Sequence, residues 1–209
     1  HILETFRLVG FAKVFLLDND LENFFTRIKV ALNVDLPEKD CILAIRDFLQ
    51  GKVYSTENIE EYDPFSKAIF LILQEFSVLD NDYKRFAQNI YQAKLLASDI
   101  HHYEIELFCD LLIAYSYSKM DIIEKAVSIY KDVHDTAERT AMFNILVIAK
   151  YLLAIIKQKT NFDESMMLIN DALSLLRKYS NQAQILFALV QKLYINLAEN
   201  SEAEVFDLE

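Results

Sequence analysis

The sequence predicts an all-α protein of tandem helical hairpins, arranged as a degenerate, right-handed solenoid of the tetratricopeptide-like type. Three observations lead to this fold class. The 209 residues include only two glycines and two prolines, and this scarcity removes most of the tight turns that β-hairpins need. Hydrophobic residues make up 53% of the chain, and they follow helical spacing over most of its length. Residues that favour helix ends recur at intervals that divide the chain into helix pairs.

The first 60 residues are expected to form helices followed by a loop. Apolar residues at helical spacing predict a helix over residues 2–17, and a second helix is expected to end near residue 32. Pro37 suits the first position of a third helix, and Gly51 suits the residue that follows its last turn. The acidic stretch 52–63 is expected to be a loop.

Helix starts are marked more sharply after residue 60. Asp63 before Pro64 is an N-cap followed by proline at the first helical position. An acidic turn ending at Asp82 precedes the next periodic stretch, and Ser98 and Asp99 are expected to cap the one after it. These signals predict helices over residues 64–78, 83–97 and 102–117.

The next helices are predicted from two capping boxes. The boxes are Asp135-x-x-Glu138 and Asn161-x-x-Glu164, and each precedes a strongly periodic stretch. A shorter helix is expected before the first box. The predicted helices are 121–133, 138–158, 162–179 and 182–198, and the acidic tail 199–209 is expected to fray.

The predicted helices group in pairs with a period of roughly 36 to 44 residues, which is typical of tetratricopeptide-like solenoids. The best single match is Phe162 and Ser165 followed by Ala172 and Leu173, where small residues let neighbouring helices approach. The paired units begin near residues 64, 102, 138 and 182. We therefore expect one helical-repeat domain over 1–209, with N-terminal helices and the acidic loop in 1–60, hairpins in 61–198 and the tail in 199–209.

Composition excludes several classes of function. A formal net charge of −11 opposes binding to nucleic-acid phosphates, and glycine-rich phosphate loops are absent, so no nucleotide cofactor is expected. Cys41 and Cys109 are expected to be reduced, buried thiols of a cytoplasmic protein. The longest apolar stretch, 145–156, contains Lys150 and is shorter than the roughly 20 residues of a membrane span. Because the chain begins at His1 and not at Met, we expect a segment to be missing upstream.

The titratable residues do not predict an enzyme. His101 and His102 are adjacent, and adjacent helical side chains point about 100° apart, so no metal site is expected there. Glu106 and Asp110 share one helical face, as part of a solvated surface or as an electronegative groove for a cationic ligand group. A carboxylate pair for glycoside cleavage is a weaker alternative. No nucleophile with a base, metal set or phosphate loop is found, so we expect no catalytic activity.

Amide and aromatic side chains alternate on two of the predicted helices. Asn144 and Tyr151 share a face of the helix 138–158, and Gln184 and Gln191 repeat this pattern on the last helix. An amide offers both a donor and an acceptor, which suits the backbone of an extended peptide. The alternative is a polar outer face, or an asparagine that is bonded within the scaffold.

The stretch 99–108 (DIHHYEIELF) resembles a segment of the Rgg/GadR/MutR family of Gram-positive transcriptional regulators. In that family an aromatic residue, two acidic residues around a spacer and Leu-Phe open a long helix. The similarity continues through 121–133 and 161–179, although the family often has Trp where this chain has His102.

The resemblance implies a C-terminal helical-repeat domain that dimerises and binds short, often apolar, signalling peptides, as in quorum sensing. It also implies that DNA is bound only through an N-terminal helix-turn-helix that this chain lacks, and that peptide binding is transmitted by repacking of hairpins. The alternative is a tetratricopeptide-like adaptor that scaffolds a protein complex. The residues predicted to contact the peptide are Asn144, Tyr151, Gln184 and Gln191, with Glu106 and Asp110 at one end.

Overall fold

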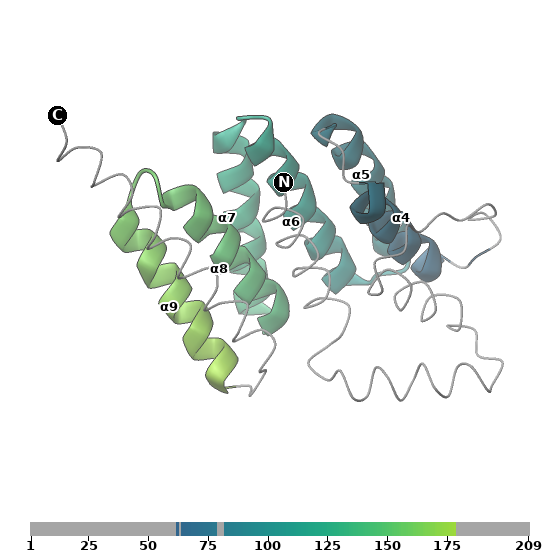
Figure 1. Ribbon diagram of the computed structural model, residues 1–209. Coiled ribbons are helices and arrows are strands. Elements are labelled where there is room, and N and C mark those ends of the chain that lie inside the picture. The colour runs from purple at the N-terminus through teal and green to yellow at the C-terminus, as the bar shows by residue number, and fades with distance from the viewer. Residues whose placement is uncertain (1–61, 63, 79–81, 179–209) are drawn as a thin grey trace. The chain divides into compact units, whose positions relative to one another are not determined.

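The computed structural model describes residues 62, 64–78 and 82–178, and within these ranges it contains six α-helices and no strand (Figure 1). The predicted all-α fold of helical hairpins is confirmed. None of the helices in these ranges is long and apolar enough to cross a membrane. In chain order they are α4 (Pro64–Val78), α5 (Tyr83–Asp99), α6 (Tyr103–Lys119), α7 (Ile123–Arg139), α8 (Phe143–Lys157) and α9 (Phe162–Lys178).

Several helix starts lie where the capping residues predict them. Helix α4 has the predicted bounds, and α5 begins after Asp82, whose carboxylate accepts the Arg85 backbone N–H at 3.0 Å. Before α9, the Asn161 side chain accepts the Glu164 backbone N–H at 3.1 Å and donates to the Glu164 carboxylate at 3.2 Å. This capping box satisfies a backbone donor that the first helical turn leaves open.

The predicted helix start at Asp135-x-x-Glu138 is wrong. Both residues lie inside α7, which continues to Arg139, and α8 begins only at Phe143. The apolar stripe explains the difference, because Ala137 lies within the box, is fully buried and extends the core face of α7 through it. Burial of that stripe outweighs a capping preference of about 1 kcal/mol.

The start of α6 also differs from the prediction. Ser98 and Asp99 belong to the end of α5 and do not cap the next helix. The N-cap of α6 is His102, whose Nδ1 accepts the Ile105 backbone N–H at 3.4 Å. The three-residue turn between the helices therefore starts later than the capping preferences indicate.

Three of the turns between helices share one geometry. The second residue after the helix has a positive φ in each, of 57° at His101, 62° at Asp121 and 56° at Ala141. The next backbone N–H then donates to a carbonyl five residues earlier, as in a Schellman motif. These bonds run from His102 to Ala97 (2.8 Å), from Ile122 to Tyr117 (2.9 Å) and from Met142 to Ala137 (2.9 Å). Each bond reverses the chain, so that the next helix runs back along the previous one.

The second helix of each pair buries the same pattern of positions. The buried positions follow an i, i+4, i+7, i+11 spacing, and equivalent residues lie 40 apart between α5 and α7 and 39 apart between α7 and α9. The buried sets are Phe86, Ile90, Ala93 and Ala97 in α5, Ala126, Tyr130, Val133 and Ala137 in α7, and Ser165, Ile169, Ala172 and Leu176 in α9. The structure thus contains the repeat that the helix pairs predict.

The chain divides into two compact units, His1–Ile129 and Tyr130–Glu209. In the first unit, α5 packs against both α4 and α6 (Figure 1). The carboxylate of Glu75 in α4 is only 6% exposed. It accepts a 2.6 Å hydrogen bond from the Asn89 side chain in α5 and lies 4.0 Å from the Arg85 guanidinium. A buried charge is tolerated only with such partners, so this cluster fixes the α4–α5 pairing.

In the second unit, α8 packs against α9. Ten consecutive residues of α8, from 145 to 154, are buried, as expected for a helix with neighbours on several sides. The buried Ser165 hydroxyl of α9 donates to the Ala154 carbonyl of α8 at 2.7 Å. Ser165 and Ala172 are both fully buried, so the predicted close approach of helices at these small residues is confirmed.

Replacing Ala141 by glycine is expected to stabilise the protein by about 1 kcal/mol, because a side chain disfavours the left-handed conformation by roughly that amount. The free energy of unfolding in urea is the measurement. The control is Ser174→Gly at an exposed position inside α9, which is expected to destabilise by about 0.5 kcal/mol. A loss of stability in both variants would contradict the turn geometry.

Replacing Asn89 by alanine is expected to destabilise the protein by about 2 kcal/mol, because the buried Glu75 carboxylate loses its shortest hydrogen bond. Glu75→Gln removes the charge but keeps a polar side chain, and it is expected to have the smaller effect. Urea denaturation of both variants tests this order. Equal losses of stability in the two variants would show that the hydrogen bond from Asn89 does not stabilise the buried charge of Glu75.

Candidate functional site

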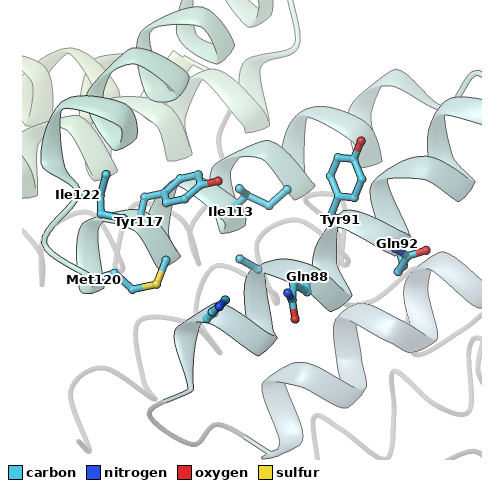
Figure 2. Close-up of a pocket in the computed structure, with 9 residues that line it drawn as sticks. Gln88, Tyr91, Gln92, Ile113, Tyr117, Met120 and Ile122 are labelled. Carbon is cyan, nitrogen blue, oxygen red and sulfur yellow. The ribbon is translucent and has the colours of Figure 1, made fainter.

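A groove of about 470 Å³ lies between α5 and α6 in the first unit. Figure 2 shows Gln88, Tyr91 and Gln92 on α5, and Ile113 and Tyr117 on α6. The turn that follows α6 completes the groove. The lining residues are Lys84, Ala87, Gln88, Tyr91, Gln92, Ile113, Tyr117, Met120 and Ile122.

The groove lies at the end of the α5–α6 pair that is remote from the turn between the two helices, because its lining begins at Lys84 on α5 and extends beyond Tyr117 to Met120 and Ile122. Near that turn, α5 buries the small residues Ala93 and Ala97. Farther from the turn, α5 buries Phe86 and Ile90, and the centre of the Phe86 ring lies 6.1 Å from that of Phe76 in α4.

Two glutamines supply most of the hydrogen-bonding groups of the groove. Gln88 and Gln92 are exposed and lie four residues apart on α5, a rise of about 6 Å along the helix. Each side-chain amide can donate and accept at the same time. The pair can therefore bind two peptide groups, two residues apart, of one extended ligand.

The aromatic side chains of the groove differ in exposure and in partners. Tyr91 is 49% exposed, whereas Tyr117 is half-buried. The Lys125 ammonium of α7 donates to the Tyr117 hydroxyl at 2.8 Å and lies 4.1 Å from the centre of its ring. Both contacts orient Tyr117 and place a positive charge next to the groove.

An ion pair lies one helical turn beyond the groove. The Lys94 ammonium binds both oxygens of the Asp110 carboxylate, at 2.7 and 2.8 Å. Lys94 is one turn from Tyr91 on α5, and Asp110 is one turn from Ile113 on α6. The pair thus links the helices at the end of the groove that is nearer the turn.

Asp110 and Glu106, the two acidic residues predicted to contact a peptide, have different surroundings in the structure. Asp110 is about one-quarter exposed, and its carboxylate is bound by Lys94. Glu106 is half-buried one turn earlier on the same face of α6. Both residues lie on the face of α6 that continues into the groove. In the structure, Asp110 binds Lys94 and so links α6 to α5.

The amide and aromatic residues predicted on α8 and the last helix are not brought to this groove. Asn144 is half-buried in the first turn of α8. Tyr151 is only 1% exposed, and burial raises the pKa of its hydroxyl. The expected open stripe through Tyr151 thus differs from the structure, which packs this ring inside the second unit. Gln184 and Gln191 lie outside the described residues.

Gln88 and Gln92 of α5 are not among the residues predicted from the sequence to contact a peptide. The stretch 88–92 (QNIYQ) shows the same mixture of amides and an aromatic residue that predicts a peptide contact on the last helix. Its spacing was visible in the sequence. Its partners Tyr117 and Lys125 are far along the chain, and only the hairpin brings them to the same site.

The described residues hold no group of three or more His, Cys, Asp or Glu side chains that could bind a metal ion. His101 occupies the left-handed position of a turn, and His102 caps α6, so the two have separate structural parts. Cys109 is a free, fully buried thiol whose pKa is raised chiefly by burial. Such a thiol is a poor nucleophile.

Comparison of the chain with models of protein families, with curated proteins and with solved structures finds no match in any of the three. The resemblance of residues 99–108 to the Rgg/GadR/MutR family therefore stays a prediction. The groove is therefore described by the chain's own residues and contacts.

Replacing Lys94 by methionine is expected to destabilise the protein by about 1 kcal/mol, because the half-buried Asp110 carboxylate loses its counter-charge. Adding Asp110→Asn in the same chain is expected to restore part of the loss. Lys131→Met, at an exposed position of α7, is the control and is expected to leave the free energy of unfolding unchanged. The free energy of unfolding is the measurement, and a loss that Asp110→Asn does not reduce would contradict the pairing.

Proposed function

We propose that this chain is the peptide-binding and dimerisation domain of a cytoplasmic transcriptional regulator. In this proposal a short signalling peptide binds the helical repeats, which continue as a right-handed, tetratricopeptide-like solenoid. Binding switches DNA-binding heads that are linked to the two copies of the domain. The observation that supports the proposal most is the groove between α5 and α6, which combines glutamine amides with tyrosine rings.

The chemistry of the groove suits a peptide better than a small metabolite or a nucleic acid. An extended peptide has donors and acceptors at regular intervals, and glutamine amides can bind both. Its apolar side chains can pack on aromatic rings. A nucleic acid is disfavoured because the chain has a net charge of −11, and charge of that sign repels phosphates.

The hairpin turns offer a route by which binding could be transmitted. The α5–α6 pair is closed by the 2.8 Å bond from His102 to Ala97 and by the Lys94–Asp110 ion pair. A ligand that binds both helices favours the arrangement in which their spacing fits it. In a dimer, a change in this spacing alters the separation of two linked heads, and half-site recognition depends on that separation.

The sequence of the native gene upstream of the His1 codon tests the proposal. We expect an open reading frame that encodes about 60 to 70 residues with a helix-turn-helix pattern, because a regulator needs a DNA-binding head. A start codon at or just before His1 would contradict the proposal. The chain would then be the free-standing adaptor of the alternative hypothesis.

A further inference from the structure

We infer that the α5–α6 groove binds an extended peptide segment that carries a carboxylate, with the carboxylate at the Lys84 end. This inference rests on the proposed function and narrows the ligand from any short peptide to an anionic one. Three properties of the groove support it: the spacing of its amides, the character of its walls and the distribution of charge around it.

The amide spacing matches the repeat of an extended chain. Gln88 and Gln92 are separated by about 6 Å along α5. In an extended strand, peptide groups that face the same side recur every two residues, or about 6.6 Å. One glutamine can therefore bind one peptide group and the next glutamine the second, with little adjustment of either side chain.

The walls of the groove suit apolar side chains. Tyr91 and Ile122 are 49% and 44% exposed, although both are large hydrophobic residues. The edge of the buried Ile113 on α6 and the half-buried Met120 directly after α6 complete the apolar lining. Exposed hydrophobic surface with polar groups at its edge is typical of a binding site. Side chains on either side of a bound peptide would cover these residues.

The charge of the groove favours an anionic ligand. Lys84 is the only charged residue of the lining, in a chain whose net charge is −11. The Lys125 ammonium is held against Tyr117 beside the lining. The nearby carboxylates of Asp82 and Asp110 already accept hydrogen bonds, from a backbone N–H and from Lys94 respectively.

The acidic residues after α6 lie at the same end of the groove as Lys84, because α5 and α6 are antiparallel, and they restrict the ligand carboxylate to the α5 wall at that end. Asp121 lies in the turn between Met120 and Ile122, and Glu124 begins α7; both are exposed. A ligand carboxylate on that side would meet like charges, whereas Lys84 on α5 offers an opposite charge. The ligand carboxylate is therefore assigned to the α5 side of the groove.

The test uses the whole chain and random decapeptides selected on it by mRNA display. The tightest selected peptides are synthesised twice, with free carboxylates and with every carboxylate replaced by an amide. Fluorescence polarisation gives the Kd of each for the parent, Lys84→Gln and Gln88→Leu. Lys131→Gln, an exposed lysine of α7 outside the groove, is the matched control. Benzoylphenylalanine at Tyr91 reports by photo-crosslinking whether the peptide lies in the groove.

We expect the Lys84→Gln and Gln88→Leu variants each to weaken binding by about tenfold, the scale of one lost hydrogen bond or ion pair in a partly exposed site. The amidated peptide should bind the parent more weakly and be insensitive to Lys84→Gln. Lys131→Gln should bind like the parent, and the Tyr91 probe should crosslink to the peptide.

Three results would overturn the inference in different ways. Peptides that bind tightly, but ignore both groove variants and do not crosslink at Tyr91, would place the site elsewhere and leave the proposed function standing. Failure to select any peptide that binds better than its scrambled version would overturn both the groove inference and the proposed function. If binding depends on Gln88 but not on the ligand carboxylate or on Lys84, the inference of an anionic ligand is wrong, although the peptide lies in the groove.

Discussion

The left-handed residue in three of the turns between helices is the constraint on which the rest of the structure depends. It allows the chain to reverse within three residues and closes each turn with a hydrogen bond of 2.8 to 2.9 Å. The core stripes of α5, α7 and α9 recur at intervals of 40 and 39 residues along the chain that these turns fold back on itself. The α5–α6 groove lies at the end of this hairpin that is remote from the turn at His101, and the Lys94–Asp110 ion pair joins the helices between the turn and the groove.

The sequence predicts a helix start well where a side chain caps the helix by a hydrogen bond. It predicts a helix boundary poorly where burial of an apolar stripe determines it. Asp82 and the pair Asn161 and Glu164 cap helices as their side chains indicate. Asp135 has the same kind of signal, but an uninterrupted apolar stripe carries the helix past it. The turn at Ala141 has no signal at all, because alanine occupies a position that usually holds glycine. Burial of Ala137 thus overrides the local capping preference of Asp135.

The candidate site was less predictable than the fold, for a similar reason. The amide pattern of Gln88 and Gln92 is local and readable, but the ring of Tyr117 and the charge of Lys125 join it only through tertiary packing. Conversely, Tyr151 fits a ligand-binding pattern in the sequence and is enclosed by the fold. A polar or aromatic stripe on a helix indicates a binding surface only if the next helix leaves it uncovered.

The measurement that tests this account most directly is hydrogen–deuterium exchange of the whole chain, with and without the tightest selected decapeptide. The account predicts slower exchange in residues 84–92 and 113–122, since a ligand between α5 and α6 suppresses opening of that hairpin. It predicts little change in α9, which lies in the other unit. Protection confined to residues 143–178, with none in α5 and α6, would contradict it.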